Sequence, residues 1–520
     1  MARKAKKKAS KKKTAKKTAV KKSRAPKRAR RRTGPARAEA GETGGTGGVT
    51  EMGEAGRGAT TAQDGAGETA RGAATETHRA KVRMYRQGLG DCFLISLPRN
   101  DGNSRPFYVM IDCGVVLGTS DPGTIMKQVM DNIVKVTDGE IDILIATHAH
   151  WDHVSGFVQA ADSFARLKVG QVWLAWTENN DDELTRKIKE DRGLALSALR
   201  MRLSQIQLAG DADSAAELGG ILEFFGAARG PTTEDALESV RAKAKPRYCL
   251  PTDPPVVPAG TDARFYVLGP PHDWKMLRKI NPSARDQETY GLALDGLGMF
   301  MDGAGTALGN ADIGRPFDQQ YEIPFVYAQL ALELDFFRKN YWQPAGAAPD
   351  AWRRIDTDWL VGSTEMALQL DSLTNNTSLV LAIEFPDGDQ SSHGDVLLFA
   401  ADAQVGNWLS WQDRVWTVDG KAVTGPDLLK RTILYKVGHH GSHNATLREK
   451  GLQQMERLRV AMLPVDHEMA VKKRWGKMPL TEIVEALNKR AKDGVLRVDE
   501  PKPPTMQNVV EDPLFFEATF

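Results

Sequence analysis

Four potential metal ligands lie within six residues of this chain, in the run His148-Ala149-His150-Trp151-Asp152-His153. The run directly follows the apolar segment 141–147, which predicts a buried strand. Imidazoles and a carboxylate crowded at the end of a buried strand are costly unless they are bound to something. Since imidazoles and carboxylates together bind divalent ions that activate water, the run predicts a hydrolytic metal centre. A polar surface loop with accidental histidines is the alternative.

Further polar groups stand at the ends of other predicted strands. Asp112 closes one strand, Asn375-Asn376 precede another, Asp402 closes a third, and His439 and His440 close a fourth. Polar groups at several strand ends, far apart in sequence, are how a sheet assembles a site. Each also has a simpler reading. Asp402 can cap a following helix, and Asp112 and the two asparagines can be turn residues.

Alternating and continuous apolar runs predict the elements that position these groups. Strands are expected at 82–86, 92–97, 107–111, 141–147, 169–176, 264–268, 378–385, 395–401, 431–437 and 458–464. Helices are expected at 122–137 and 154–167, through most of 180–245, near 325–340, 358–370 and 404–413, after Ser442, and near 479–492. This order predicts an α/β protein with two sheets and helices outside them, and two largely helical insertions at about 178–260 and 273–370.

The composition limits the class of protein. The chain has 520 residues, 41% of them hydrophobic, which is enough for one large folded domain with insertions. Three cysteines offer no disulfide framework, so we expect a reducing, cytoplasmic setting. No segment approaches the roughly 18–20 apolar residues of a membrane helix, and no apolar core follows the N-terminal charges as in a secretory signal. We therefore expect no membrane partner.

The charge is divided between a basic tail and an acidic body. Residues 1–32 hold 18 Lys or Arg and no acidic residue, so the net charge of +3 leaves −15 for residues 33–520. We expect a disordered tail at 1–32, a flexible Gly/Ala/Thr linker at 33–80 and a folded domain at 81–520. The tail predicts sequence-neutral nucleic-acid binding through its phosphate-neutralising cations. A solubilising segment, a nuclear signal or a contact with the acidic body are alternatives. The residues expected to bind are Lys6, Lys7, Lys8, Lys11, Lys12, Lys13, Arg30, Arg31 and Arg32.

Three segments carry a resemblance to a known family. They are Gly88-Leu89-Gly90-Asp91-Cys92-Phe93-Leu94-Ile95, Asn375-Asn376-Thr377-Ser378-Leu379-Val380-Leu381 and Lys436-Val437-Gly438-His439-His440-Gly441-Ser442. Together with the His-x-His-x-Asp-His run, they resemble the metallo-β-lactamase fold superfamily, and most closely the hydrolase domain of the ComEC/Rec2-type competence proteins. The resemblance covers residues 82–490 in pieces.

The resemblance implies a four-layer αββα sandwich with two divalent metal ions, Zn²⁺ or Mn²⁺, at one edge of the sheets. It implies that His148 and His150 bind the first ion, that Asp152, His153 and one of His439 or His440 bind the second, and that Asp402 bridges both. Asp112 and Asn376 would hold ligands in place. The spacing does not decide between His439 and His440. Since asparagines stand where many members have a histidine, the first position is expected to be weaker or richer in oxygen ligands.

The function expected from the resemblance is metal-dependent hydrolysis by activated water, most simply of phosphodiester bonds in DNA or RNA. Asp152 and Asp402 would carry this chemistry, and His443, or whichever of His439 and His440 is not a ligand, would protonate the leaving group. Two alternatives remain. One is a small-molecule hydrolase acting on a cyclic nucleotide, thioester or lactone, because one fold serves many substrates. The other is a catalytically inactive protein that binds nucleic acid.

Overall fold

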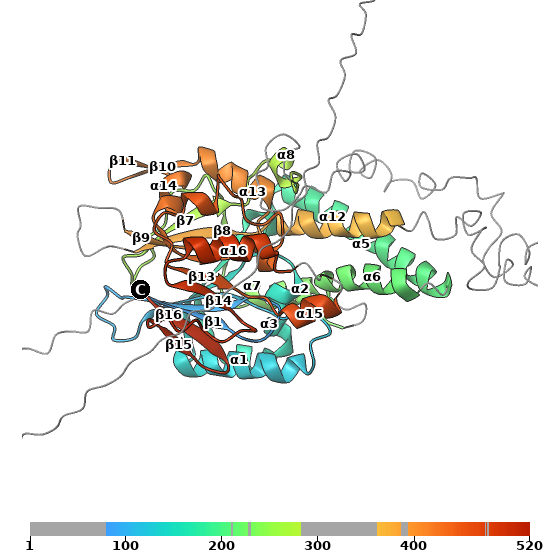
Figure 1. Cartoon of the computed structure of the whole chain (residues 1–520), viewed down its shortest axis with the longest axis horizontal. Coiled ribbons are helices and arrows are strands. Elements are labelled where there is room, and N and C mark those ends of the chain that lie inside the picture. Colours follow the sequence, from blue (N-terminus) through green and yellow to red (C-terminus); the bar gives the residue numbers. More distant parts are fainter. Residues whose placement is uncertain are drawn as a thin grey trace, which may run out of the picture. The chain divides into compact units, whose positions relative to one another are not determined.

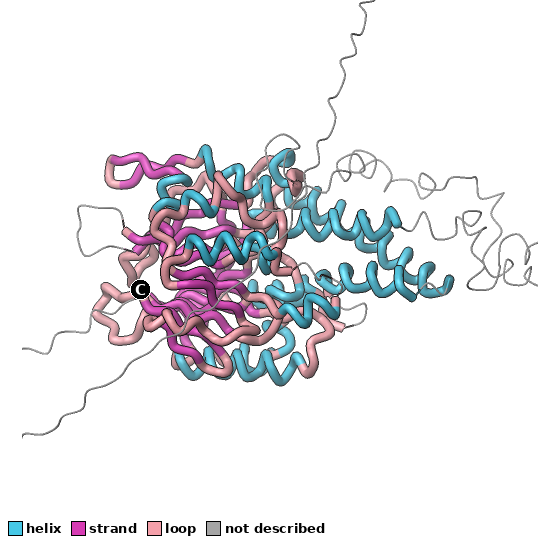
Figure 2. Tube along the Cα trace, viewed as in Figure 1, coloured by secondary structure: helices cyan, strands magenta, loops and turns pink. Residues whose placement is uncertain are grey.

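The computed structural model describes residues 80–209, 212–226, 230–281, 361–385, 394–473, 475 and 478–520. These residues form two mixed β-sheets with helices on their outer sides, so the predicted α/β class is confirmed (Figures 1 and 2). The predictions for the basic tail at 1–32, for all but the last residue of the linker at 33–80, for the helix near 325–340 and for most of the second insertion lie outside the described residues. No helix in the described part of the chain is both long and apolar enough to cross a membrane.

The first sheet carries the candidate loop 148–153 at its edge. In spatial order its eight strands are β15 (Val509–Glu511), β16 (Phe515–Thr519), β1 (Lys81–Tyr85), β2 (Cys92–Leu97), β3 (Phe107–Cys113), β4 (Glu140–Ala146), β5 (Lys168–Ala175) and β6 (Pro246–Cys249). Strands β3 to β6 are parallel. Because parallel strands are covered on both faces, β3 and β4 read as nearly continuous apolar runs.

The second sheet carries Asp402 and the two histidines of the 439–440 pair. Its strands, in spatial order, are β14 (Gly494–Arg497), β13 (Val460–Leu463), β12 (Thr432–Lys436), β9 (Asp395–Phe399), β8 (Val380–Phe385) and β7 (Arg264–Gly269). Strands β9, β12, β13 and β14 run parallel. The loops after β9 and β12 therefore emerge at the same edge of this sheet. The hairpin β10 (Val415–Val418) and β11 (Lys421–Thr424) stands apart from both sheets.

An apolar cluster joins the inner faces of the two sheets. Phe93 of β2 meets Phe399 of β9 edge to face, with ring centroids 5.6 Å apart, and Trp173 of β5 meets Phe265 of β7 in the same way. Helices bury the outer faces. On the first sheet these are α1 (Pro122–Val136), α2 (Trp151–Val154), α3 (Gly156–Gln159), α4 (Ala161–Ala165) and α7 (Thr233–Arg241). On the second they are α13 (Val405–Ser410), α14 (Gly425–Lys430), α15 (His467–Lys472) and α16 (Thr481–Arg490).

Three further helices pack on one another beside the sheets. They are α5 (Glu183–Ala209), α6 (Ala212–Leu222), which leads into the short helix η2 (Glu223–Phe225), and α12 (Val361–Asn375) (Figure 1). They share a small apolar cluster of their own. The range 178–260 thus holds α5 and α6, but it also holds α7, which covers the first sheet, and β6, which is part of that sheet.

The structure corrects several expected elements. The helix expected after Ser442 is wrong: in the described residues 442–458 there are turns and only the short helix η9 (Leu452–Gln454). Side chains from neighbouring elements bond this segment, because Trp408 Nε1 donates to the carbonyl of Ala445 and Tyr435 shares a hydrogen bond with Thr446. The helix expected at 154–167 is broken into three short helices. The C-terminal strands β14, β15 and β16 were not expected.

Candidate metal centre

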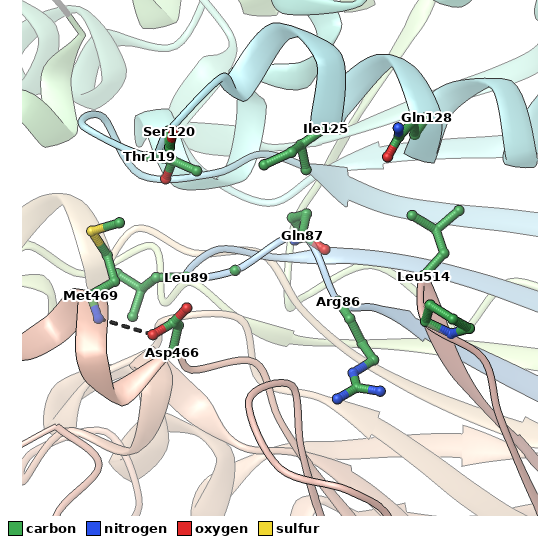
Figure 3. Close-up of a pocket in the computed structure, with 12 residues that line it drawn as sticks. Arg86, Gln87, Leu89, Thr119, Ser120, Ile125, Gln128, Asp466, Met469 and Leu514 are labelled. Carbon is green, nitrogen blue, oxygen red and sulfur yellow. Dashed lines mark hydrogen bonds between the residues drawn. The ribbon is translucent and has the colours of Figure 1, made fainter.

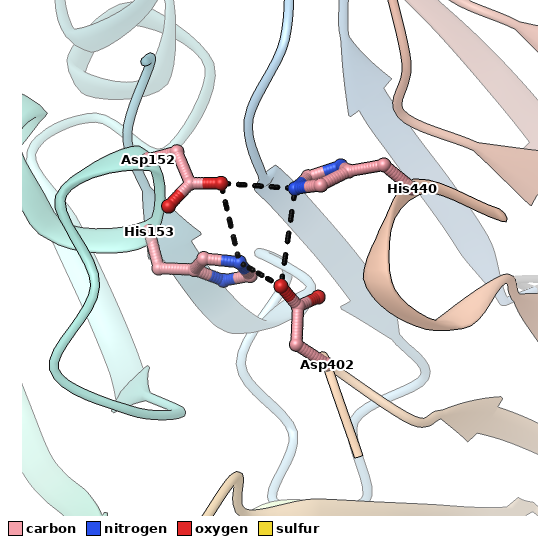
Figure 4. A group of neighbouring side chains, drawn as sticks. All are labelled: Asp152, His153, Asp402 and His440. Carbon is pink, nitrogen blue, oxygen red and sulfur yellow. Dashed lines mark hydrogen bonds and ion pairs between the residues drawn. The ribbon is translucent and has the colours of Figure 1, made fainter. Parts of the chain in front are cut away.

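Four side chains from three distant segments converge at the edge of the sheets. They are Asp152 and His153 from the short helix α2 after β4, Asp402 from the loop after β9, and His440 from the short helix η8 (Gly438–Gly441) after β12 (Figure 4). One ligand atom from each lies within 4.8 Å of all the others, and all four residues are at most 1% exposed. Asp152 Oδ2 is 2.9 Å from His440 Nε2, and Asp402 Oδ2 is 3.1 Å from His153 Nε2. These four groups can hold a metal ion.

A second group of nitrogen and oxygen atoms lies next to the first. His148 Nε2 is 3.2 Å from His150 Nδ1 and 3.2 Å from Asn375 Oδ1. It is also 3.9 Å from Asp402 Oδ2, so this carboxylate faces both groups. After the roles expected from the resemblance, we call His148, His150 and Asn375 the first position and Asp152, His153 and His440 the second position. Asp402 lies between the two.

The distances between these atoms fit metal ligation. Ligands at the ~2.0–2.2 Å bond length of zinc lie about 3.3–3.6 Å from one another around a tetrahedron. Neighbouring atoms of the two groups lie 2.9 to 3.9 Å apart, and the ligand atoms of Asp152, His153, Asp402 and His440 all lie within 4.8 Å of one another. Four buried imidazoles and two buried carboxylates packed at such distances provide the mixed nitrogen and oxygen donors of a divalent metal site. The donor set present here therefore fits a pair of divalent ions.

The structure distinguishes the two adjacent histidines. Both have left-handed backbone angles, with φ of 39° at His439 and 51° at His440, and the resulting turn sends the rings in different directions. His440 Nε2 reaches Asp152, while its Nδ1 bonds the carbonyl of Pro464. His439 instead lies between Ser442 Oγ and the amide nitrogen of Asn375. Non-glycine residues seldom adopt this backbone region, and two such residues in succession separate the two rings.

Replacing the two histidines one at a time is expected to give different losses. If the centre binds two ions, His440→Ala should remove one of them, because His440 belongs to the group of four side chains that can hold an ion. His439→Ala should keep both ions and lower turnover by roughly a hundredfold, because a group that assists proton transfer or substrate binding is lost. Metal analysis of both variants after dialysis, together with kinetics, separates the two. Equal metal loss in both variants would contradict this assignment.

Asp112 contacts the ring of His153, as expected for a residue that holds a ligand in place. Its Oδ2 is 2.8 Å from His153 Nδ1, which leaves Nε2 to face the ligand group. The same carboxylate accepts hydrogen bonds from the amide and the hydroxyl of Thr147. It is fully buried and also has a left-handed backbone, with φ of 56°. Such a carboxylate–histidine pair fixes the tautomer and orientation of a metal ligand.

Gly114 lets the ligand loop approach strand β3 closely. A Cβ atom at this position would lie 2.3 Å from the backbone carbon of Asp152 and 2.5 Å from the backbone nitrogen of His153. Contacts this short do not occur, so any side chain would push the loop away. The position of two candidate ligands therefore depends on a glycine that directly follows strand β3.

Gly114→Ala is consequently expected to weaken metal binding and to destabilise the fold by about 1–3 kcal/mol, the cost of overpacking. Titration with Zn²⁺ and denaturant unfolding measure the two effects. Gly123→Ala is the matched control, because a Cβ there meets nothing within 4 Å. If Gly114→Ala bound metal and unfolded like the Gly123→Ala protein, the close approach would not matter.

Asn376 was expected to hold a ligand in place, but the contacts of the two asparagines differ from this expectation. Asn375, not Asn376, faces the ligand rings. Asn376 donates to the backbone of Met276 and Leu277 and accepts from the amides of Gln404 and Asn407. It therefore supports the loop that follows Asp402 rather than a ligand. The N-cap of α13 is Gln404, so Asp402 does not cap that helix.

His443 belongs to neither ligand group of the described residues. It is partly exposed and follows Ser442, whose hydroxyl contacts His439. Its role in protonating a leaving group stays a prediction.

Two charged residues in the recognised segments belong to the site although the sequence reasoning gave them no role. Lys436 is 1% exposed, its Nζ lies 2.5 Å from Asp91 Oδ2 and 3.3 Å from Asp402 Oδ1, and it donates to the carbonyl of Ala401. Asp91 also lies within a ligand-like group with Asp112 and His153. Both residues lie in segments that carry the resemblance: Asp91 follows Gly90, and Lys436 begins the segment with the two histidines. A charged residue next to an otherwise apolar strand was the sequence feature that could have indicated their place in the site.

Burial and charge divide the histidines into two kinds. Burial lowers the pKa of His148 well below its usual value and the pKa values of His150 and His439 to about 3 and about 4. These three rings are neutral at pH 7. Burial also opposes charging of His153 and His440, but neighbouring carboxylates, Asp402 foremost, outweigh it and raise both pKa values. Metal binding at the second position must therefore displace protons.

Aromatic side chains from η2 cover the first position. The His150 ring lies 5.4 Å from the ring of Phe224 and 5.1 Å from that of Phe225, and Phe224 stacks on Trp475 at 4.7 Å. These rings belong to the apolar cluster formed by α5, α6 and α12. The helices beside the sheets thus form one wall of the centre.

A separate cavity of about 340 Å³ lies between the β1–β2 loop, the start of α1 and the start of α15 (Figure 3). Arg86, Gln87 and Asp466 line it, together with Leu89, Ile125 and Met469. Asp466 caps α15 through the amide of Met469. None of the candidate ligands lines this cavity.

Comparison with known proteins does not add to this picture. No family model matches the sequence, and a search of curated proteins gives no match.

Proposed function

We propose that this protein is a metal-dependent hydrolase of the metallo-β-lactamase fold, with two divalent ions, Zn²⁺ or Mn²⁺, at the sheet edge. The two sheets, with an apolar cluster between them and helices outside, support the four-layer αββα arrangement. The single observation that carries the proposal is the convergence of Asp152, His153, Asp402 and His440 from three distant loops, next to His148 and His150.

In the proposed centre, His148, His150 and Asn375 hold the first ion, Asp152, His153 and His440 hold the second, and Asp402 faces both. The ions, when bound, lower the pKa of water and stabilise negative charge on a phosphoryl oxygen. The protein's own groups do the rest. Asp112 orients His153, and the backbone N–H of His439 donates a 3.2 Å hydrogen bond to Asp402 Oδ1. Lys436 holds the carboxylate of Asp402 from the opposite side.

We propose a phosphodiester in DNA or RNA as the substrate. The support is the basic tail: 18 cations in residues 1–32 raise the local concentration of a polyanion next to an otherwise acidic body. Lysine and arginine without aromatic residues bind phosphates rather than bases, so cleavage would be independent of sequence.

A specific observation favours a second candidate, a small phosphodiester such as a cyclic nucleotide. All candidate ligands are buried, and Phe224, Phe225 and Trp475 lie over His150. A polymer needs an open groove, whereas a small substrate needs only a small opening in such a cover. The two candidates share the same metal chemistry.

The decisive assay uses the full chain, loaded with Mn²⁺ or Zn²⁺, on labelled single-stranded and double-stranded DNA, on RNA and on cyclic nucleotides. The control is the double variant Asp152→Ala, His153→Ala, which removes two ligands of the second position. Cleavage of any of these substrates well above the control supports the proposal. Wild-type activity no greater than that of the control on every substrate would discard it.

Removing residues 1–80 is expected to separate binding from chemistry. The truncated chain should bind DNA at least tenfold more weakly at low salt, with a smaller dependence of affinity on salt, because the counterions released by the tail are lost. Its turnover of a small chromogenic phosphodiester should stay within about twofold, since the ligands lie at 148–440. Fluorescence anisotropy at several salt concentrations measures the first effect. Unchanged DNA affinity would place binding outside the tail.

A further inference from the structure

A buried carboxylate outside every recognised motif faces the first metal position. Asp371 lies on α12, one turn before Asn375, and is 5% exposed. Its Oδ1 has no hydrogen-bond partner among the described residues, and neither has His150 Nε2. These two buried atoms are 3.8 Å apart. Burying both atoms unpaired is unfavourable, and their proximity suits them to serve one another.

The other oxygen of Asp371 reaches the same position through Asn375. Asp371 Oδ2 accepts a hydrogen bond of 3.2 Å from Asn375 Nδ2, as residues four apart on one helix face can. With its nitrogen held in this way, the amide of Asn375 directs Oδ1 toward His148 Nε2 at 3.2 Å. One carboxylate is thus in position to act on two of the three groups at the first metal position.

We propose that Asp371 is the positioning residue of the first metal position. Its Oδ1 accepts the Nε2–H of His150, which fixes the tautomer that leaves Nδ1 for the ion, and its Oδ2 fixes the rotamer of Asn375. The inference rests on the proposed metal centre, and it extends that centre to a helix beside the sheets. Carboxylates that accept the free N–H of a ligand histidine commonly raise metal affinity in this way.

The surroundings of His150 leave this role to Asp371. The ring is flanked by Phe224 and Phe225, and neither phenyl ring can accept a hydrogen bond as strong as one to a carboxylate. His150 Nδ1 is already directed at His148 Nε2. The two atoms lie 3.8 Å apart, beyond hydrogen-bond length, so the proposed contact requires one side chain to rotate toward the other.

The test is metal stoichiometry and affinity, measured with Zn²⁺ in competition with a chromophoric chelator, on four forms of the full chain. Wild type should bind two ions. His148→Ala, which lacks a ligand of the first position, should bind one tightly. Asp371→Leu should keep the second ion and bind the first roughly 10–100-fold more weakly. Asp371→Asn has one oxygen where the carboxylate has two, so it should fall between Asp371→Leu and wild type.

The visible spectrum of the Co²⁺-loaded proteins gives a readout independent of activity. Bands lost in His148→Ala should also be altered in Asp371→Leu, and the double variant should lose no more than His148→Ala alone. Two ions bound with wild-type affinity by Asp371→Leu and Asp371→Asn would overturn the inference. If Asp371→Leu fails to fold, Asp371→Asn, which keeps the shape of the side chain, decides alone. Wild type binding fewer than two ions would instead refute the proposed dinuclear centre.

Discussion

Asp402→Ala is expected to abolish hydrolysis, with a loss of at least about a thousandfold, and to lower the affinity for both ions. Its Oδ2 lies 3.1 Å from His153 Nε2 and 3.9 Å from each of His148 Nε2 and His440 Nε2. No other carboxylate in the described residues approaches a histidine of both positions so closely. Losing one preorganised electrostatic group typically costs a hundredfold to a thousandfold, and here two positions lose their shared ligand.

Metal content after dialysis and the rate of phosphodiester cleavage measure this effect. The matched control is Asp162→Ala, an exposed aspartate in the first turn of α4, which should leave both unchanged. An Asp402→Ala protein that still bound two ions would show that the bridging position belongs to another group. Retained metal with lost activity would restrict Asp402 to the chemical step.

Lys436→Met is expected to destabilise the metal-free protein by about 3–5 kcal/mol, the usual result of removing one partner of a buried ion pair. The lysine neutralises Asp91 and Asp402, and all three side chains are at most 2% exposed. Burial opposes its charge, but Asp91 and Asp402 outweigh this and raise its pKa above that of a free lysine. A raised pKa stabilises the fold fully below the unfolded value of about 10.4. The loss should therefore be constant between pH 6 and 9.

Denaturant unfolding of the metal-free proteins tests this expectation. Lys168→Met, at a side chain that is 84% exposed, is the control and should change stability by less than about 0.5 kcal/mol. The double variant Asp91→Asn, Lys436→Met should be less destabilised than the sum of the single variants, because no unpaired carboxylate remains at position 91. Additive losses would show that Lys436 acts through packing alone.

The sequence predicted those parts of the site in which ligand type and strand position coincide. The run from His148 to His153 follows an apolar strand, and Asp112 and Asp402 each close another, so their convergence followed from parallel strands ending at one edge. Asp371 could not be found in this way. It lies on α12 one turn before the resembling segment begins at Asn375, and only the packing of α12 beside η2 brings it to His150.

Local backbone geometry decided a second group of features. Two adjacent histidines are equivalent in a sequence, but left-handed angles at both direct His440 to Asp152 and His439 to Asn375. The same geometry, with the tertiary hydrogen bonds to residues 445 and 446, replaced the helix expected after Ser442 by turns. Helical preference is weak over such a short segment, and contacts made by distant elements outweigh it.

The sequence by itself determined the α/β class, most strands and the residue types of a metal centre, because apolar periodicity and ligand spacing are local properties of the chain. The tertiary structure alone decided which histidine of the pair joins Asp152, why Asn375 rather than Asn376 faces the rings, and how Asp91, Lys436 and Asp371 enter the site. These depend on contacts between residues up to 345 positions apart. Such contacts are set by packing and buried charge, which no local pattern encodes.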